Sequence, residues 1–390
     1  MRWFLPLTLV VSVPAAAQTT PPRPPAVGWE FVGLPALNFA TDEGFGYGAL
    51  LEAYNYGQGV QPYRFTIQPT VFLTTKGRRD VVVFFDAPRI LPENWRLDAM
   101  LAREEHLATP YYGIGNASLF SEQNEAAPNA YFYRFGKRQL RVAANVQRKL
   151  GSYPARLLMG AGFASVRTDA TPFDSGTTLF VTDFGGAEPR GRINFLRAGL
   201  VWDTRDRESG PTGGSWSELL VQRVDELLGA TSSYSRVTAT TRRYVPVTRR
   251  LVFAQRLLAQ QTDGIVPVFD LATVQTSFKG QEGLGGGNTV RGLPKNRYVG
   301  KGLLVSNSEL RLRAAEFDLL GKSLHLVLSG FVDAGRVWSE TIRLGEVLAE
   351  LHAGYGGGLR VGVGPSFVAA FDLGRSSEST QIYIGLGYPF

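Results

Sequence analysis

The stretch QIYIGLGYPF, residues 381–390, alternates between two kinds of side chain along its length. Successive side chains of a β-strand point to opposite faces. One face of this stretch is therefore apolar and carries Ile382, Ile384, Leu386, Tyr388 and Phe390. An apolar face that ends in an aromatic residue is typical of a lipid-facing strand anchored at a membrane interface. We expect such a strand here; the alternative is a buried strand of a soluble sandwich.

The same period of two recurs along most of the chain, whereas the 3.6-residue period of amphipathic helices is scarce. In NSELRLRA, residues 307–314, Glu309 shares one face with Asn307, Arg311 and Arg313. In HLVLSGFVDAG, residues 325–335, Asp333 lies on the face opposite Leu326, Leu328 and Val332. Alternation therefore places Glu309 and Asp333 on the inward faces of their strands. We predict sixteen strands, near 29–41, 44–56, 63–74, 79–90, 95–105, 130–149, 154–166, 194–205, 214–225, 233–245, 250–262, 302–314, 323–338, 354–364, 366–374 and 380–390. The predicted fold is all-β, a transmembrane antiparallel β-barrel of about sixteen strands.

The connections between these segments alternate in length from the third pair onward. Long segments near 106–129, 167–193 and 263–301 alternate with short ones such as GSYP, residues 151–154. Barrels of the outer membrane have short periplasmic turns and long outer loops. The alternation therefore predicts that the 283–300 loop lies outside and that both ends of the chain lie in the periplasm. A soluble sandwich has no reason to alternate in this way.

The first residues, MRWFLPLTLVVSVPAAAQ, are typical of a secretory signal. One cation precedes an apolar run that is too short to span a bilayer as a helix, and a small-residue site ends at Ala17. We expect a signal peptide over 1–17, a Pro-rich spacer over 18–28 and the barrel over 29–390; a retained membrane anchor is the alternative. An exported chain without cysteine is not a disulfide scaffold.

The segment GLGGGNTVRGLPKNRYVG, residues 283–300, places an arginine in the middle of a glycine-rich loop. It lacks the Gly-Lys-Ser/Thr of a phosphate-binding loop and the spacing of a dinucleotide-binding loop. The histidines, His106, His325 and His352, are scattered and have no cysteine partners, so a metal site is not expected. We therefore expect no cofactor and no enzyme active site.

The formal net charge is +7, but the charge forms no basic stripe and the chain is exported. These properties argue against a nucleic-acid partner. A basic barrel fits better beside anionic lipid headgroups or around a cation-lined lumen.

Four motifs, in order along the chain, resemble the barrel of the BamA/TamA superfamily, also called the bacterial surface antigen family. They are LVWDTRDRESGPTGG (200–214), VPVFD followed by GLGGGNTVRGL (266–270 and 283–293), NSELRLR (307–313) and FVDAGRVW (331–338). The aromatic-ended last strand and PALNFATDEGFGYG, residues 35–48, agree with the layout of that family. The resemblance implies a barrel of the bacterial cell outer membrane.

The chain departs from the family ahead of the barrel. Members usually carry periplasmic POTRA repeats there, which receive client chains, whereas this sequence has only the short spacer 18–28. Some relatives carry a patatin lipase domain instead, but no Gly-x-Ser-x-Gly elbow occurs here. The chain therefore resembles a branch without POTRA domains, and the partner that would replace them is left open.

In that family the glycine-rich loop folds back into the lumen, and its arginine meets acidic residues on the two following strands. The resemblance implies that Arg291, between Val290 and Gly292 at the loop tip, forms an internal lock with Glu309 and Asp333. A glycine-rich loop can bend sharply, and a guanidinium confined in a lumen needs carboxylate partners. The alternative is a solvated loop arginine.

By resemblance, the favoured function is assisting the insertion or translocation of polypeptides or lipids at the outer membrane. Outer-membrane lipids and lipopolysaccharide, client polypeptides and a periplasmic partner are the candidate partners. The last strand would form a weak lateral seam with the first, because Gly385 and Gly387 pack poorly and Pro389 donates no hydrogen bond. Tyr388 and Phe390 complete this seam and the C-terminal signal. Alternatives are a loop-gated passive diffusion channel and a structural or adhesive surface barrel; the oligomeric state is left open.

Overall fold

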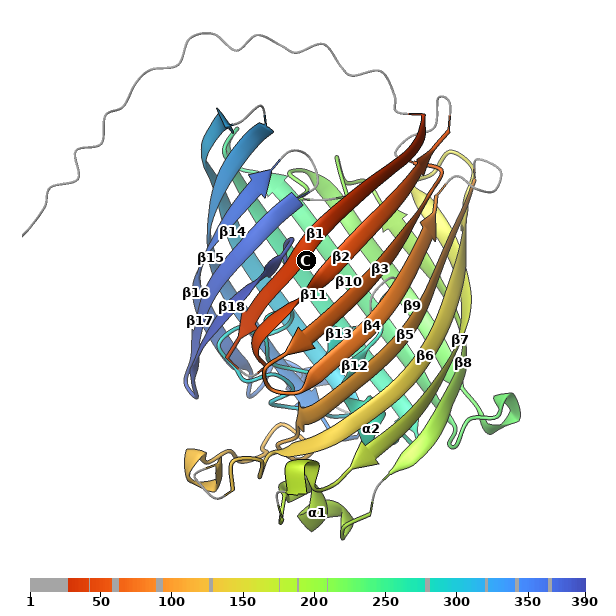
Figure 1. Ribbon diagram of the computed structural model, residues 1–390, viewed down its shortest axis with the longest axis vertical. Helices are drawn as coiled ribbons and strands as arrows, with labels where there is room; N and C mark the ends of the chain where they lie inside the picture. The colour runs from red at the N-terminus through yellow and green to blue at the C-terminus, as the bar shows by residue number, and fades with distance from the viewer. Residues whose placement is uncertain are drawn as a thin grey trace, which may run out of the picture.

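The chain forms a closed antiparallel barrel of sixteen strands, which confirms the predicted fold class. In the computed structural model the described residues are 27–390, apart from 42, 58–62, 89–93, 126–128, 175, 188, 209, 278–280, 320–321, 341–343 and 364–366. Strands that follow one another in the sequence are neighbours around the ring, and β18 meets β1 to close it (Figure 1).

The barrel strands lie close to their predicted positions. They are β1 (Gly28–Ala40), β2 (Gly44–Tyr56), β3 (Phe65–Thr74), β4 (Arg78–Ala87), β5 (Trp95–Pro110), β6 (Arg134–Lys149), β7 (Ala155–Asp169), β8 (Arg190–Asp203), β9 (Gly214–Val224), β10 (Tyr234–Pro246), β11 (Leu251–Gly264), β14 (Gly302–Leu319), β15 (Lys322–Trp338), β16 (His352–Val363), β17 (Phe367–Ser376) and β18 (Thr380–Leu386). The connection between β11 and β14 contains its own small sheet, formed by β12 (Thr273–Val274) and β13 (Gln281–Glu282).

The helices are short. They are η1 (Glu122–Glu125), η2 (Pro172–Asp174), α1 (Leu179–Phe184), η3 (Glu226–Leu228), α2 (Val268–Leu271) and η4 (Leu344–Glu346). Among the described residues, no helix is long and apolar enough to cross a membrane.

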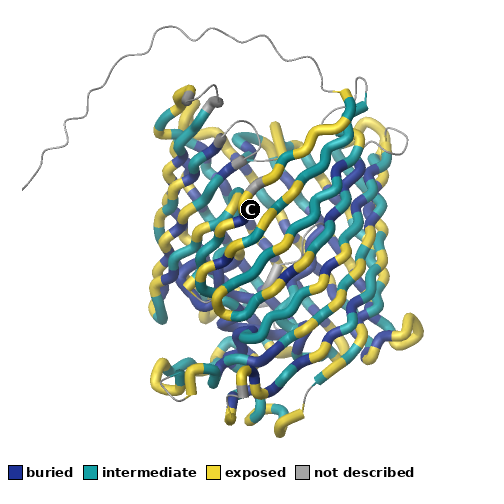
Figure 2. Tube along the Cα trace, viewed as in Figure 1, coloured by how far each residue is buried: buried dark blue, intermediate teal, exposed yellow. Residues whose placement is uncertain are grey.

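Buried and exposed residues alternate along the strands of the wall (Figure 2). Many of the buried residues are polar or charged. In β9, Leu219 and Val221 are each 47% exposed, whereas Glu218 and Gln222, on either side of them in the sequence, are buried. The largest fully buried side chains include Arg236, Arg256, Arg291 and Arg360. Apolar side chains outside and charged side chains inside are the pattern of a barrel that faces lipid and encloses a polar lumen.

The long connections gather at one end of the barrel, which we call the long-loop end (Figure 1). It carries residues 111–133, 170–189 and 265–301, together with α1 and α2. The opposite end, the short-turn end, carries turns such as 150–154, and β1 begins there. This arrangement follows the alternation of loop lengths in the sequence.

The end of the chain differs from the prediction. The last strand was expected to reach Phe390, but β18 ends at Leu386. Gly387 has φ +81°, a left-handed conformation that favours glycine and turns the backbone out of the wall. Phe390 was expected to face lipid, and that prediction is wrong: the residue is 5% exposed and packs against the inward-facing Tyr244 and Ala254.

The predicted signal peptide, 1–17, lies outside the described residues, as does the predicted spacer 18–28 up to residue 26. The barrel begins at Gly28, within one residue of the predicted boundary. The signal and the spacer therefore remain predictions.

We expect a cation on the outer face to be costly near the middle of a strand. Leu219 lies at the centre of β9 on the outer surface. Leu219→Arg should lower the free energy of unfolding in bilayers by about 2–4 kcal/mol, because a charge at the bilayer midplane loses its hydration. Val247→Arg, in the exposed 247–250 turn, is the control and should cost less than about 1 kcal/mol. Equal costs at the two positions would contradict the assignment of the outer face.

Candidate functional site

The connection between β11 and β14 does not stay at the long-loop end. Residues 283–300 turn back into the lumen and pack with inward-facing residues of the wall. The buried apolar cluster there contains Leu258, Val274, Leu284, Val290, Leu293, Tyr298, Leu303, Val305 and Val337. Glycine is required at the bend, because Gly292 has φ +99° and a Cβ there would lie 2.5 Å from the backbone of Arg375. The loop therefore fills part of the lumen with a packed core of its own.

Arg291, at the tip of this loop, is 1% exposed and contacts both acidic residues that the sequence pointed to. Its Nε donates to Oδ2 of Asp333 at 2.8 Å, and its Nη2 donates to Oδ1 of the same carboxylate at 3.1 Å. Its Nη1 donates to Oε2 of Glu309 at 3.0 Å. The guanidinium also lies over the ring of Phe331, 3.4 Å from the ring centroid. The structure thus brings Arg291, Glu309 and Asp333 together between β14 and β15.

Three further charged residues surround this group. Asp372 of β17 lies 3.5 Å from Nη1 of Arg291 and makes a two-pronged ion pair with Arg360 of β16, at 2.8 Å for each contact. Arg311 of β14 donates from Nε to Oε1 of Glu309 at 3.0 Å. We call these six residues the lock network: Arg291, Glu309, Arg311, Asp333, Arg360 and Asp372. Three arginines and three carboxylates make its formal charge zero.

Three of the six residues of the lock network, Arg291, Glu309 and Asp333, were singled out from the sequence. Glu309 and Asp333 could be placed by strand alternation and by the motif resemblance. Asp372 and Arg360 also occupy inward positions of their strands, but nothing in the sequence indicates that the loop reaches them. Buried charges need hydrogen-bonded partners, so the burial of both residues, rather than their spacing, reveals their role.

The join between β1 and β18 is the shortest ladder of the barrel wall. In the described residues only Phe39↔Ile384 and Ala40↔Tyr383 are paired across it, whereas the β1–β2 ladder has thirteen pairs. One side-chain contact extends the join, because the Ile382 N–H donates to Oγ1 of Thr41 at 3.1 Å. All of these contacts lie near the end of β1 where the loop connections gather. The predicted seam residues Gly385 and Gly387, with Tyr388 and Phe390, lie beyond the last paired position.

The lumenal loop contacts the strand on one side of this join through Gly292. The Gly292 N–H donates to the hydroxyl of Tyr383 on β18 at 3.2 Å. The Gly292 carbonyl accepts from Ser376 Oγ at 2.9 Å and from Ser379 Oγ at 2.7 Å, next to the β17–β18 turn. These contacts fasten the loop to β18.

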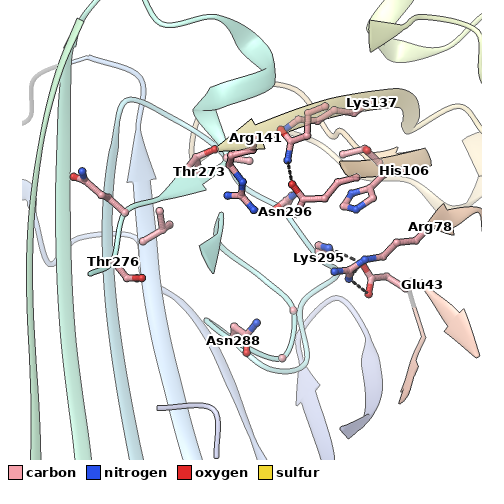
Figure 3. A pocket seen from close by; sticks show the side chains of 18 of the residues that line it. Glu43, Arg78, His106, Lys137, Arg141, Thr273, Thr276, Asn288, Lys295 and Asn296 are labelled. Atoms are coloured by element: carbon pink, nitrogen blue, oxygen red, sulfur yellow. Dashed lines mark hydrogen bonds and ion pairs between the residues drawn. The ribbon is translucent and has the colours of Figure 1, made fainter. Parts of the chain in front are cut away.

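On the other side of the join, Lys295 reaches the turn between β1 and β2 (Figure 3). Its Nζ lies 2.5 Å from Oε1 of Glu43, and Arg78 of β4 pairs with the same carboxylate at 3.0 Å. The loop therefore holds β18 through Gly292 and the β1–β2 turn through Lys295. Neither contact was predicted from the sequence, because both join residues that are far apart along the chain.

A second loop arginine, Arg297, lies nearer the long-loop end and is 3% exposed. Its Nε lies 2.6 Å from Oε2 of Glu378, in the β17–β18 turn. Its other nitrogens donate to the hydroxyl and the carbonyl of Ser118, in the β5–β6 connection. Arg297 thus joins three connections that meet above the lumen.

The space left beside the loop is a polar cavity of about 460 Å³ (Figure 3). Charged side chains that line it form ion pairs along its wall: Arg141 with Glu104 at 3.0 Å and Arg236 with Asp270 at 2.8 Å. Lys137 donates to the carbonyl of Phe269 at 2.9 Å. The loop therefore fills part of the lumen and leaves beside it a cavity whose charged side chains have partners.

A model of the Omp85 superfamily domain matches residues 71–390 of the chain. A search of curated proteins with this chain found no match. Among solved structures, BamA from Haemophilus ducreyi lacking POTRA domains 1-3 is similar with a TM-score of 0.58 and 14% identity, over 93% of this chain and 71% of that one.

CdiB from Escherichia coli is similar with a TM-score of 0.59 and 10% identity, over 95% of this chain and 64% of that one. CdiB from Acinetobacter baumannii is similar with a TM-score of 0.52 and 11% identity, over 92% of this chain and 60% of that one. The chain thus spans less than two thirds of the length of either CdiB chain. At these identities the likeness is one of fold.

Removing the central cation should destabilise the barrel. Arg291→Ala leaves Asp333 buried without its guanidinium and Glu309 with Arg311 alone, so we expect the free energy of unfolding to fall by about 3–5 kcal/mol. The measurement is denaturant unfolding in lipid vesicles, with protease sensitivity of residues 283–300 as a second reading. Asp333→Asn should act in the same way, and the double variant should be less than additive because both changes break one network. Fully additive losses would argue against a lock.

The contact between Lys295 and Glu43 should hold the join between β1 and β18. For Lys295→Gln we expect faster amide exchange at Ile382 and Ile384, whose N–H groups face β1, measured by mass spectrometry, with a stability loss of about 1 kcal/mol or less because the pair is partly exposed. Lys301→Gln is the matched control. Lys301 lies at the end of the same connection, just before β14, but pairs with Glu340 at 2.9 Å instead of with the β1–β2 turn. If both variants exchange alike, the loop does not hold the join.

Proposed function

The chain belongs to the Omp85 superfamily, and from that membership we propose that it assists the insertion or translocation of polypeptides or lipids at the outer membrane. The barrel is a protein of the bacterial outer membrane. The proposed working part is the seam between β1 and β18, which opens sideways into the bilayer. Clients would be polypeptides that present a strand, and outer-membrane lipids and lipopolysaccharide would surround the opening.

One observation carries this proposal: the two-pair ladder between β1 and β18. In the described part of the chain, residues from Gly28 to Asn38 of β1 have partners on β2 but none on β18. An unpaired backbone group in lipid costs several kcal/mol, so this edge favours any strand that can pair with it. An extended client segment could bind there by adding a strand to the sheet.

The lumenal loop would control how far the seam opens. Gly292 contacts β18 and Lys295 contacts the β1–β2 turn, so separation of the two strands must break one of these contacts. The lock network anchors the loop to β14, β15, β16 and β17, which stay in the wall. In this proposal the loop is a fixed strap and the β1 side is the part that moves.

A second candidate is a loop-gated diffusion channel. The cavity of about 460 Å³ beside the loop supports it, since displacement of the loop would widen the aqueous space in the lumen. The two candidates differ in which part must move. Insertion needs the seam to open, whereas diffusion needs only the lumen to open.

A disulfide across the seam separates these candidates. Phe39 and Ile384 are paired directly across it, so Phe39→Cys with Ile384→Cys places two cysteines opposite each other in a chain that has none of its own. We expect the cross-linked barrel to remain folded, judged by heat-modifiable migration, but to lose client insertion into vesicles. Reduction should restore the activity.

The control cross-link uses the same residue of β1. Phe39→Cys with Phe45→Cys joins β1 to β2, which are already fully paired, and should leave insertion unchanged. Full insertion activity in the Phe39–Ile384 cross-linked barrel would remove the seam proposal. An unchanged conductance in both cross-linked barrels would leave the channel as the remaining candidate.

A further inference from the structure

The last four residues of the sequence, 387–390, form a segment inside the lumen, which we call the tail. Figure 1 marks the end of the chain level with the middle of the strands rather than at either rim. The backbone leaves the wall at Gly387, whose N–H still donates to the carbonyl of Val368 on β17 at 2.8 Å. The tail is therefore tied to the wall at one end and directed inward at the other.

The inner wall of β10, β11 and β14 receives the ring of Phe390. The ring packs in a buried cluster with Tyr244, Val252 and Ala254. The guanidinium groups of Arg256 and Arg311 each lie 5.2 Å from its centroid. Cations at this distance from an aromatic face are attracted to it, most strongly where water is excluded.

Arg311 also contacts the rest of the tail. Its guanidinium lies 4.4 Å from the ring centroid of Tyr388, and its Nη2 donates to the carbonyl of Phe390 at 3.3 Å. Its Nε is held by Glu309 of the lock network. The rings of Tyr388 and Phe390 and the main-chain oxygen of Phe390 thus all contact Arg311, whose own position is held by its hydrogen bond to Glu309.

The tail separates two cavities. One is the cavity of about 460 Å³ beside the loop, and the other, of about 520 Å³, is lined by Glu208 and Gly210 of the β8–β9 turn at the short-turn end. The residues common to both linings are Phe84, Thr276, Tyr388 and Pro389. Tyr388 is also packed against the β8–β9 turn, where a Cβ on Gly210 would lie 2.9 Å from its ring.

We propose that the inner wall of β10, β11 and β14 is a binding site for an aromatic peptide segment, occupied in cis by Tyr388-Pro389-Phe390, and that this occupancy keeps the two cavities apart. The ligand class follows from the site: a buried slot for one ring, a second ring beside Arg311, and a guanidinium N–H that donates to the main-chain oxygen of the residue that carries the first ring. Proline suits the middle position because it has no N–H to satisfy in the slot. This inference does not depend on whether the seam inserts clients.

The test measures conductance through single barrels in planar bilayers. The full chain should show low conductance, and the variant lacking residues 387–390 should show a steady conductance severalfold higher. The synthetic peptide N-acetyl-Gly-Tyr-Pro-Phe, added from the short-turn end, should lower the conductance of the truncated barrel again. The peptide N-acetyl-Gly-Ala-Pro-Ala should not.

A second variant covers the case in which the truncated chain does not fold. Ala254→Leu fills the slot of the Phe390 ring in the full-length chain without changing any charge. It should raise conductance like the truncation and should abolish the effect of the Tyr-Pro-Phe peptide. Ala259→Leu is its matched control, because Ala259 lies on the outer face of the same strand, and it should behave like the unaltered chain.

Two results would overturn the proposal. One is a folded truncated barrel, or a folded Ala254→Leu barrel, whose conductance equals that of the full chain. The other is equal block by the aromatic peptide and the alanine peptide, because block without the rings is not binding at this site.

Discussion

A guanidinium buried inside a membrane barrel is the constraint on which the rest of this molecule depends. Arg291 cannot be left in the lumen without carboxylates, since an unpaired buried charge costs several kcal/mol. Glu309, Asp333 and Asp372 meet that need from three strands, and Arg311 and Arg360 balance the added negative charge. The network therefore fixes where the loop lies, and the loop in turn determines which parts of the lumen remain open.

The same loop contacts both sides of the shortest ladder in the barrel wall. Two ladder pairs join β1 to β18, and both lie next to the loop's contacts with Tyr383 and Glu43. Away from these contacts the edge of β1 runs on without a partner in the described residues. The contacts that close the barrel are thus concentrated at one end of the seam. Some of them come from loop residues 292 and 295, which are distant from β1 in the sequence. The tail, held by Arg311, connects the other end of the seam to the same network.

Much of this could be predicted from the sequence. Period-two alternation placed all sixteen strands, because a wall between lipid and water imposes it on every strand. It also put Glu309 and Asp333 on the inner face, and the motif resemblance paired them with Arg291. The position of Phe390 was wrong, since alternation alone continues a strand through Gly387, where the backbone in fact turns. Lys295 and Glu43 were missed because a contact between distant loops leaves no local pattern.

The length of β18 has a consequence for the lipid around it. A strand needs about 9–11 residues to cross the hydrocarbon core. β18 has seven, because the chain leaves the wall at Gly387 and the four residues that follow the strand lie in the lumen. A wall shorter than the bilayer is accommodated by thinning of the bilayer beside it. The membrane next to β18 should therefore be thinner than elsewhere around the barrel. The place where the wall is least complete would also be the place where the lipid barrier is lowest.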